Sequence, residues 1–389
     1  MATDGNNEVY PLMFAIVESR GTETWGWLLA CLLTYVTNQT NLCIISDRHR
    51  GIQSCFDDTT RGYLQAPLTH HQYCLRHLVS NFYTNFNSLP LKNFVLKAAT
   101  ANQVRKFENT MDLIKNVNPA AYDYLKAVGK EKWTLAHDHG HQYGTMTTNL
   151  SKCFNGVLKG ASSLPITTMV KLTFYKVNSY FDDRCNKTLE QMEEGQEWCK
   201  YAYDKFEANQ EKAKLHIVRR MSTQQRLYTV QTQSNLFTTN GGVHTYRVDL
   251  IEMTCTCEKW EAYKIPCSHL IAICAKYNQD ATKFMDRFYN VSERYHSYEL
   301  MFQLLKDRLE WPNPEERRTV MPNPLLIREK SRPKSMRIYN EMDDDDREFP
   351  TFLWIENGPK SKCGLCHQEG HNRRKCPTQN AESTSHGAT

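Results

Sequence analysis

Four side chains of the kinds that bind zinc fall within a short stretch of this 389-residue chain, and they constrain its folding more than any other feature. They form the pattern Cys-x-Cys-x9-Cys-x-His, made of Cys255, Cys257, Cys267 and His269. Zinc favours four thiolate or imidazole ligands in a tetrahedron. The alternative is a scatter of buried cysteines beside a core histidine. Four ligands at such close spacing favour a structural zinc ion instead.

The local sequence also suggests how these ligands could meet. Side chains two residues apart project to the same side of an extended chain, so a strand end can offer both Cys255 and Cys257. Pro266 ends the following loop, and Cys267 and His269 can open a helix over residues 270–274. Cys274 lies on the apolar face of that helix, so we expect a core thiol there rather than a ligand.

A second cluster follows near the C-terminus. Its spacing, Cys-x2-Cys-x4-His-x4-Cys, is that of a retroviral-type zinc knuckle, and its four predicted ligands are Cys363, Cys366, His371 and Cys376. So short a loop cannot fold without its metal. The chain is therefore predicted to hold two structural Zn²⁺ ions, each with a closed shell of four ligands.

The knuckle contains three consecutive cations, Arg373, Arg374 and Lys375. They could contact phosphates, or they could be an ordinary solvated charge run. Knuckles that read bases usually stack them on aromatic rings, and the expected stacking positions here carry Leu365 and His367. We therefore expect no base-specific recognition, and a weak or protein-binding role remains open.

Composition indicates which redox compartment and which partners to expect for both clusters. The chain has 14 cysteines and a net charge of +5. Because the N-terminal residues do not read as a secretory leader, we expect a reducing compartment in which cysteines are thiols or metal ligands. No apolar run is long enough for a membrane span, so no membrane association is expected. The mild positive charge only weakly favours a polyanionic partner.

The pattern of apolar residues predicts an α/β part followed by a helical part. Residues 9–17 and 42–47 indicate strands, and a helix is expected between them over residues 22–33. Helical spacing dominates from about residue 72 to 215, and strands return at 227–230 and 244–248, with a hairpin turn at 240–242. Residues 311–350 carry the composition of a linker, with prolines, a basic stretch and an acidic run.

The first cysteine cluster resembles a SWIM-type zinc finger. The resemblance includes Trp260 and the block Ile265-Pro266-Cys267-Ser268-His269 as well as the ligands. SWIM fingers occur in plant Mutator-like transposases and in regulators derived from them. The resemblance therefore implies DNA or protein partners.

Four further blocks resemble the core of Mutator-like (MULE) transposases, in the family's order. They lie at residues 4–27, 44–49, 71–82 and 147–166. The resemblance implies an α/β + α fold, an incomplete ribonuclease-H-like core with a helical insertion followed by small zinc-finger modules. The expected domains are the partial transposase domain (1–185), a helical connector (186–225), the SWIM finger (226–290), a linker (291–359), the knuckle (360–378) and a disordered tail (379–389).

The resemblance also identifies what remains of a catalytic site. The family's core holds two metal ions on two aspartates and a glutamate. Asp47, at the end of a predicted strand, matches the second aspartate, although taken alone it is more often a polar residue that closes a strand. No strand matches the first aspartate, Asp4 matches a non-catalytic position, and Lys152 stands where the glutamate belongs. Because two divalent ions need several carboxylates, we expect no catalytic Mg²⁺ or Mn²⁺ and no strand transfer. Lys152 could instead pair with Asp47.

Two further groups could serve as ligands or as packing residues. Cys74 and His77 match a Cys-x2-His pair of the family and could help to bind a metal with His70 or His71, or they could be buried helix residues. His137, His139 and His141 could form a metal-binding tract or a solvated loop.

Three functions remain open. The first is a transposase-derived nuclear protein that binds DNA or chromatin partners through its fingers without cutting DNA. The second is an active or truncated transposase, and the third is a protein-interaction adaptor. We predict the first, with nuclear location implied by the resemblance alone.

Overall fold

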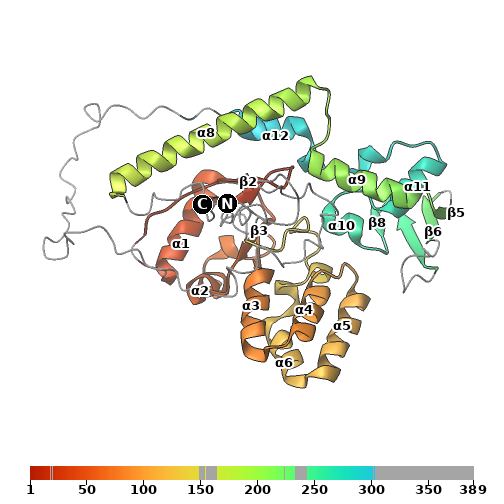
Figure 1. Ribbon diagram of the computed structural model, residues 1–389, viewed down its shortest axis with the longest axis horizontal. Coiled ribbons are helices and arrows are strands. Elements are labelled where there is room, and N and C mark those ends of the chain that lie inside the picture. The colour runs from red at the N-terminus through yellow and green to blue at the C-terminus, as the bar shows by residue number, and fades with distance from the viewer. Residues whose placement is uncertain are drawn as a thin grey trace, which may run out of the picture. The chain divides into compact units, whose positions relative to one another are not determined.

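The computed structural model describes residues 1–300 and 302, except 18, 20, 149–153, 155–163, 223 and 233–242 (Figure 1). All of these lie in a first compact unit, residues 1–334. The predicted knuckle and tail, most of the predicted linker, the predicted turn at 240–242 and Lys152 lie outside the described residues.

The N-terminal part begins with a short antiparallel hairpin and continues with a strand–helix–strand segment. The hairpin strands are β1 (Ala2–Thr3) and β2 (Val9–Tyr10). After them come α1 (Thr22–Cys31), β3 (Leu42–Ser46), α2 (Arg50–Asp57) and β4 (Thr69–Tyr73). The predictions of a helix over 22–33 and a strand over 42–47 are confirmed.

The strand predicted over residues 9–17 is wrong beyond Tyr10. Residues 11–17 extend without a ladder, and Phe14, Ile16 and Val17 are 39–50 % exposed. A strand needs a neighbour for its backbone groups, and no described segment pairs with these residues. The apolar run therefore has the composition of a strand, but beyond Tyr10 no described strand lies beside it to pair with it.

β3 and β4 form a parallel pair in which Ser46 lies opposite Tyr73. The Cys74 N–H donates to the Ser46 carbonyl at 2.7 Å, which continues the pairing to the ends of both strands. Asp47 and Cys74 therefore follow the carboxyl ends of adjacent strands. The mixed α/β and α class is confirmed, whereas a ribonuclease-H-like sheet stays a prediction.

Four helices of the predicted helical insertion follow β4. They are α3 (Leu75–Phe86), α4 (Leu89–Ala99), α5 (Val104–Val117) and α6 (Pro119–Val128). Their boundaries follow from the sequence: Asn87 takes a left-handed conformation that ends α3, and Asn118 caps α6 by accepting from the Ala121 N–H at 3.1 Å. Leu78, Phe82, Val95 and Ile114 are fully buried between these helices.

The next part combines two helices with an antiparallel sheet. α8 (Ile166–Glu193) and α9 (Lys200–Ala213) precede the sheet, whose order is β5-β6-β7-β8. The strands are β5 (His216–Ser222), β6 (Leu227–Thr232), β7 (Thr245–Asp249) and β8 (Thr254–Cys255). The strands predicted near 227–230 and 244–248 are confirmed. β5 falls in the expected helical connector and pairs with β6 along its length.

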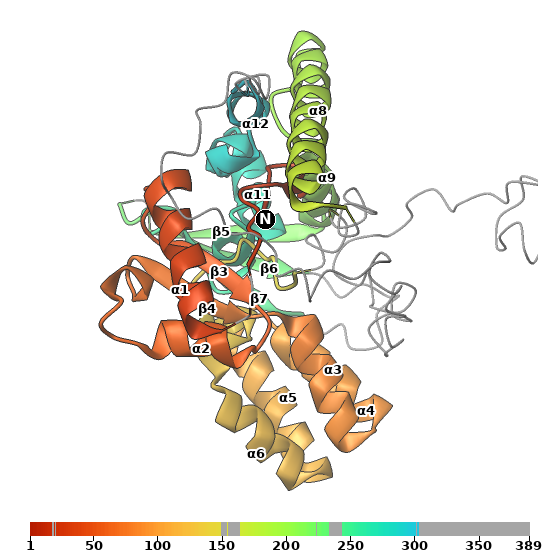
Figure 2. The same ribbon diagram turned by 90° about the vertical axis from the view of Figure 1, so that its left-hand side faces the viewer.

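Three α-helices complete the described chain: α10 (Lys259–Tyr263), α11 (Ser268–Lys276) and α12 (Val291–Tyr298). Two 3₁₀ turns, Ala281–Phe284 and Arg287–Tyr289, lie between α11 and α12. α12 lies beside α8 in both ribbon views (Figures 1 and 2). It occupies the first residues of the predicted linker, where Val291 and Tyr298 are buried. The proline-rich composition that suggested a linker starts only after this helix.

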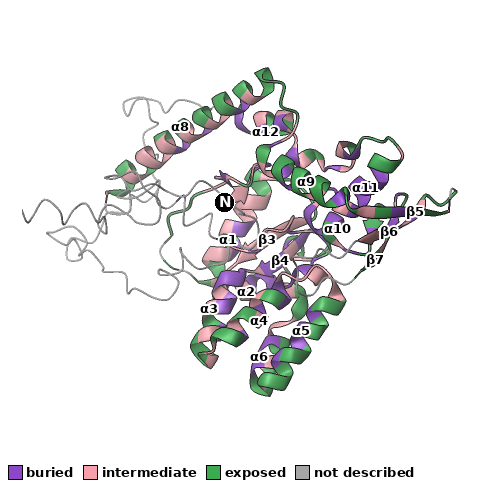
Figure 3. Cartoon of the chain, turned by 45° about the vertical axis from the view of Figure 1, so that its right-hand side comes forward, coloured by how far each residue is buried: buried purple, intermediate pink, exposed green. Residues whose placement is uncertain are grey.

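One hydrophobic core runs through the helical insertion and the segment with the first cysteine cluster. Leu78, Phe82 and Ile114 belong to the same buried cluster as Trp260 and Leu270. α11 is buried along most of its length (Figure 3). The cysteine-bearing segment is therefore packed into the larger fold rather than attached to it by a flexible tether.

Candidate metal centre

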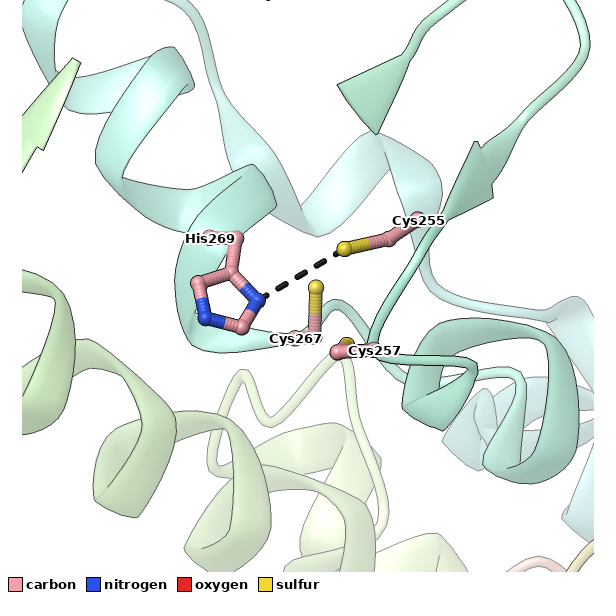
Figure 4. Close-up of side chains that lie close together, drawn as sticks. All are labelled: Cys255, Cys257, Cys267 and His269. Atoms are coloured by element: carbon pink, nitrogen blue, oxygen red, sulfur yellow. Dashed lines mark hydrogen bonds between the residues drawn. The ribbon is translucent and has the colours of Figure 1, made fainter. Parts of the chain in front are cut away.

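The four side chains of the first cluster meet at one point. Ligand atoms of Cys255, Cys257, Cys267 and His269 all lie within 4.8 Å of one another, and all four residues are buried. Cys255 Sγ lies 3.5 Å from His269 Nδ1, and the three sulfurs and this nitrogen face one another (Figure 4). Among the residues that the structure describes, this is the one such group of three or more.

The ladder between β7 and β8 sets the positions of the first two cysteines. Cys255 pairs with Val248, and the Thr256 N–H donates to the Arg247 carbonyl at 2.9 Å. Glu258 then turns the chain with a left-handed φ of 58°. Cys257 consequently lies in a tight turn that directs its sulfur toward that of Cys255.

The other two ligands come from the start of α11. Cys267 is the N-cap residue, and its carbonyl accepts from the Ile271 N–H at 3.1 Å. His269 lies in the first turn of the helix. A strand end and a helix start therefore hold the four ligands, as the sequence predicts.

The donor set fits a structural zinc ion. In a tetrahedron with zinc–sulfur bonds of about 2.3 Å the sulfurs are about 3.8 Å apart, which the observed grouping accommodates. Hydrogen bonds from Cys255 and Cys267 lower the pKa of the Cys257 thiol, while the same contacts and burial raise the pKa of Cys255. Without a metal the cluster therefore favours a single thiolate, that of Cys257. Binding of a cation would release the protons of the other two thiols.

Aromatic rings fix the orientation of the histidine. The Tyr246 ring stacks on His269 at 4.0 Å, and His216 stacks on it at 5.1 Å. His216 Nε2 lies 3.0 Å from Ser268 Oγ, which ties this outer ring to the helix start. Sequence reasoning missed His216 because β5 was not expected, and it missed Tyr246 because no local pattern links this residue of a predicted strand to His269.

Three contacts join the centre to the helical insertion. Gln103 Nε2 donates to the Thr256 carbonyl at 2.6 Å. A Cβ on Gly144 would lie 2.3 Å from Tyr263 Cε1, so only glycine allows the ring to approach so closely. The same holds at Gly140, where a Cβ would meet the Glu261 carbonyl at 2.3 Å.

Exposed cations surround this junction. Arg105 and Lys106 at the start of α5 lie near Lys259 of α10, and burial together with the Lys259 and Arg105 charges lowers the pKa of Lys106. A zinc ion with three thiolates and one imidazole carries a net charge of −1. The cations therefore lie beside a centre that partly compensates them. Nothing in the local sequence distinguished them from other surface lysines.

The proposed remnant of the catalytic site lies at the ends of β3 and β4. Asp47 Oδ1 accepts from the His49 N–H at 3.3 Å. Among the described residues, Asp47 belongs to no group of three potential metal ligands. Lys152, which occupies the position of the family's glutamate, lies outside the described residues, so its predicted pairing with Asp47 stays a prediction.

Cys74 has a distinct environment beside Asp47. It is 1 % exposed, and its sulfur accepts from the N–H and the Oγ1 of Thr148, both at 3.3 Å. Burial raises the pKa of this thiol, but hydrogen bonds from His77 and Thr148 bring it down to about 7. His71 does not join this pair, because its Nε2 lies 2.8 Å from Ser46 Oγ.

The histidine tract is only partly solvated. His139 is exposed, His137 and His141 are half-buried, and Asp138 between them is buried and accepts from the Gly140 and Gln142 N–H groups. His70 stacks on His141 at 3.8 Å. The predicted ligands Cys363, Cys366, His371 and Cys376, and the cations Arg373, Arg374 and Lys375, lie outside the described residues.

Comparison with known families agrees with this geometry. A family model for the MULE transposase domain matches residues 1–81, and one for the SWIM zinc finger matches residues 246–278. The resemblance identified from the sequence is confirmed over these two segments, and the SWIM match includes all four ligands. A comparison with curated proteins and another with solved structures each returned no match.

The described helices were also compared with what a bilayer requires. None is both long and apolar enough to cross a membrane.

Proposed function

We propose that this chain is a transposase-derived zinc protein that binds DNA through the surface around its SWIM finger and has lost strand transfer. The observation that carries this proposal is the buried four-ligand cluster, which shares a core with the helices that follow the transposase-like segment. A second Zn²⁺ ion is assigned to Cys363, Cys366, His371 and Cys376, and the protein is proposed to act in the nucleus.

Both metal sites would be structural. A catalytic zinc keeps an open position for water or substrate, whereas Cys255, Cys257, Cys267 and His269 supply four ligands and are 1–6 % exposed. Such an ion holds β8 and α11 together. Its loss is therefore expected to destabilise the fold around the finger rather than to remove a catalytic step.

The charge pattern supports DNA as the partner. Arg105, Lys106 and Lys259 are exposed and come from two elements that meet beside the finger. Like charges that lie close together repel one another, and a phosphate backbone relieves that repulsion while releasing its counterions. Arg373, Arg374 and Lys375 would form a second contact region in the knuckle.

The loss of strand transfer is supported by the missing carboxylates. Two-metal phosphodiester chemistry needs several acids around the ions. Lys152 replaces one of these acids in the sequence, and within the described residues the Asp47 carboxylate accepts only from the backbone N–H of His49. An ammonium at the glutamate position would repel the cations that the reaction requires.

DNA binding can be tested by fluorescence anisotropy with the full, zinc-loaded chain and a labelled duplex at several salt concentrations. Replacing Arg105, Lys106 and Lys259 together with alanine should weaken binding and reduce the slope of log K against log salt by up to about three. A matched control replaces Lys97, Lys115 and Lys126, which are exposed on α4–α6. An equal loss of DNA affinity in both variants, or DNA binding that does not depend on the salt concentration, would instead favour the protein-interaction adaptor.

Strand transfer needs its own assay. The full chain is incubated with terminal-repeat DNA of a Mutator-like element and Mg²⁺ or Mn²⁺, and no cleavage is expected. Cleavage that disappears in Asp47→Ala would show an active transposase and contradict the proposal.

A further inference from the structure

A cavity of about 280 Å³ is lined by residues of β4, of the short helical turn at Lys130–Lys132 and of the histidine loop at 137–141. Phe56 and Leu64 complete its apolar wall. This volume is at the small end of ligand pockets in proteins. It would accommodate one small ring system and little more.

Three buried polar atoms of residues that line this cavity lack hydrogen-bond partners among the residues that the structure describes. They are His70 Nε2, Gln72 Oε1 and His137 Nε2. Gln72 is only 5 % exposed, so solvent does not readily replace the missing partner. Buried polar atoms are nearly always paired in folded proteins. Three unpaired atoms around one cavity indicate that a ligand supplies the missing hydrogen bonds.

The neighbouring hydrogen bonds show that the cavity offers acceptors. Thr134 Oγ1 donates its proton to the Lys130 carbonyl at 2.9 Å, so it must accept from His137 Nδ1 at 2.8 Å. The proton of the neutral His137 ring is then on Nδ1, and Nε2 is an acceptor. Burial lowers the pKa of His137, which keeps this ring neutral. The Gln72 carbonyl oxygen is an acceptor as well, and His70 Nε2 is one in the tautomer that carries its proton on Nδ1, so a ligand that donates can pair with all three atoms.

The walls of the cavity also contain flat, stacked rings. His70 lies parallel to His141 at 3.8 Å, and Phe56 lies parallel to His71 at 4.0 Å. Burial lowers the pKa of His71 to about 3, so this ring also remains neutral. Neutral planar surfaces favour a planar ligand over a flexible chain.

Two other ligand classes fit less well. An anion would meet one ammonium group, that of Lys132, but also the acceptor atoms and the two carboxylates of Glu131 and Asp138, which line the same cavity. A metal ion needs convergent ligands, and among the described residues the histidines here do not come within 4.8 Å as a group of three. Unpaired acceptors around one small cavity instead suit a molecule that carries several N–H groups along one edge.

We propose that this cavity binds a nucleobase that presents amino and ring N–H groups, with guanine the best match. Guanine carries N1–H and the N2 amino group on one edge, which supplies three adjacent donors to His70, Gln72 and His137. The base could come from a free nucleoside or from an unpaired position in a strand, since both offer the same edge once unstacked. This proposal is independent of DNA binding by the finger surface.

The test is isothermal titration calorimetry, in which guanosine, adenosine and thymidine are each titrated into the full, zinc-loaded chain. We expect saturable one-to-one binding, with guanosine at least roughly tenfold tighter than thymidine, because a site left with unpaired acceptors rejects the poorer donor. A thymine-only single strand with one central guanine distinguishes the sources. If free guanosine displaces this strand, both bind at the same site. If the strand binds but free guanosine does not, the site takes unpaired bases within a strand.

Gln72→Leu separates binding from folding. It removes an oxygen that has no partner without ligand, so the melting temperature should not fall while guanosine affinity drops at least roughly tenfold. Gln231→Leu on β6 is the matched control, since that residue does not line the cavity. The proposal is overturned if no nucleoside or guanine-bearing strand binds, if Gln72→Leu binds guanosine normally, or if the cavity takes Zn²⁺ or Ni²⁺ through His70 and His137 instead.

Discussion

Arg294 Nε on α12 donates to Asp4 Oδ2 in the N-terminal hairpin at 2.7 Å, and both side chains are at most 3 % exposed. The same guanidinium reaches Glu8 Oε2 at 2.9 Å, and the Tyr298 hydroxyl donates to Asp4 Oδ2 at 3.0 Å. Asp4 Oδ1 meanwhile accepts from the Asn6 and Glu8 N–H groups. Asp4, which the resemblance assigned to a non-catalytic position, therefore ties the transposase-like start of the chain to the helix that follows the finger.

Replacing Arg294 with leucine should destabilise the fold by about 3–5 kcal/mol, because Asp4 would keep a buried charge without its ion-pair partner and Glu8 would retain only its pair with Arg184. Urea unfolding at pH 7 measures the change. Asp4→Asn added to Arg294→Leu should recover part of the loss. Lys200→Ala, which removes the exposed pair with Asp204, should change stability by less than about 1 kcal/mol. Equal effects at both sites would contradict the structural role of the buried pair.

Gly144→Ala should destabilise the contact between the turn that follows the histidine loop and the finger. Its φ is +78°, and a Cβ would lie 2.3 Å from the Tyr263 ring. Gly195 provides a matched control because its φ is +76° but a Cβ there would meet nothing within 4 Å. Gly195→Ala should lose about 1 kcal/mol from the backbone alone, and Gly144→Ala about 1–3 kcal/mol more from overpacking. Thermal unfolding measures both, and similar losses would mean that the ring moves freely.

The finger was predictable from sequence because its ligands are close together in the chain. Cys255 to His269 form a local pattern whose chemistry admits one main solution, and the strand and helix that hold them follow from the same residues. The partners that orient His269 were not predictable. His216 reaches it from β5, whose residues gave no strong strand signal, and Tyr246 reaches it from β7 through sheet pairing that no local pattern specifies.

The N-terminal part shows what could not be predicted from the local sequence. The apolar run at 9–17 has strand composition, yet only Val9 and Tyr10 pair, because pairing requires a neighbouring strand that local sequence does not reveal. The packing of the finger into the core with α3–α6 was likewise hidden. It depends on Gly140 and Gly144, whose importance appears only when Glu261 and Tyr263 are seen against them.

Zinc content should follow the predicted ligands one site at a time. The full chain should release two equivalents of zinc when its thiols are titrated, and Cys267→Ala and Cys363→Ala should each remove one. Because the finger shares a core with α5, Cys267→Ala should also speed amide hydrogen exchange in that helix. Cys274→Ala is the control, since this thiol is buried in α11 but is not a ligand. One equivalent or none in the wild-type chain would refute the two-ion prediction.

Lys205 should make the stability of the fold depend on pH in the alkaline range. Its side chain lies over the Tyr201 ring at 3.9 Å and the Tyr263 ring at 5.0 Å, and burial lowers its pKa from 10.5 to about 7. Between these two values the unfolded chain binds a proton that the folded chain does not. Stability should therefore rise with pH from about 7 to 10.5, and this group contributes no further change below about pH 7.

The comparison that isolates this effect is with Lys205→Met, which keeps the apolar stem but cannot titrate. In urea unfolding under reducing conditions at pH 7.5, 8.5 and 9.5, the wild-type chain should gain up to about 1.4 kcal/mol per pH unit relative to the variant. Thiols and other groups titrate in both proteins, so their effects cancel in the difference. Lys200→Met, at an exposed lysine of the same helix, should follow the wild-type chain. Parallel curves for wild type and Lys205→Met would show that Lys205 stays protonated in the folded state, with Tyr201 and Tyr263 stabilising its charge.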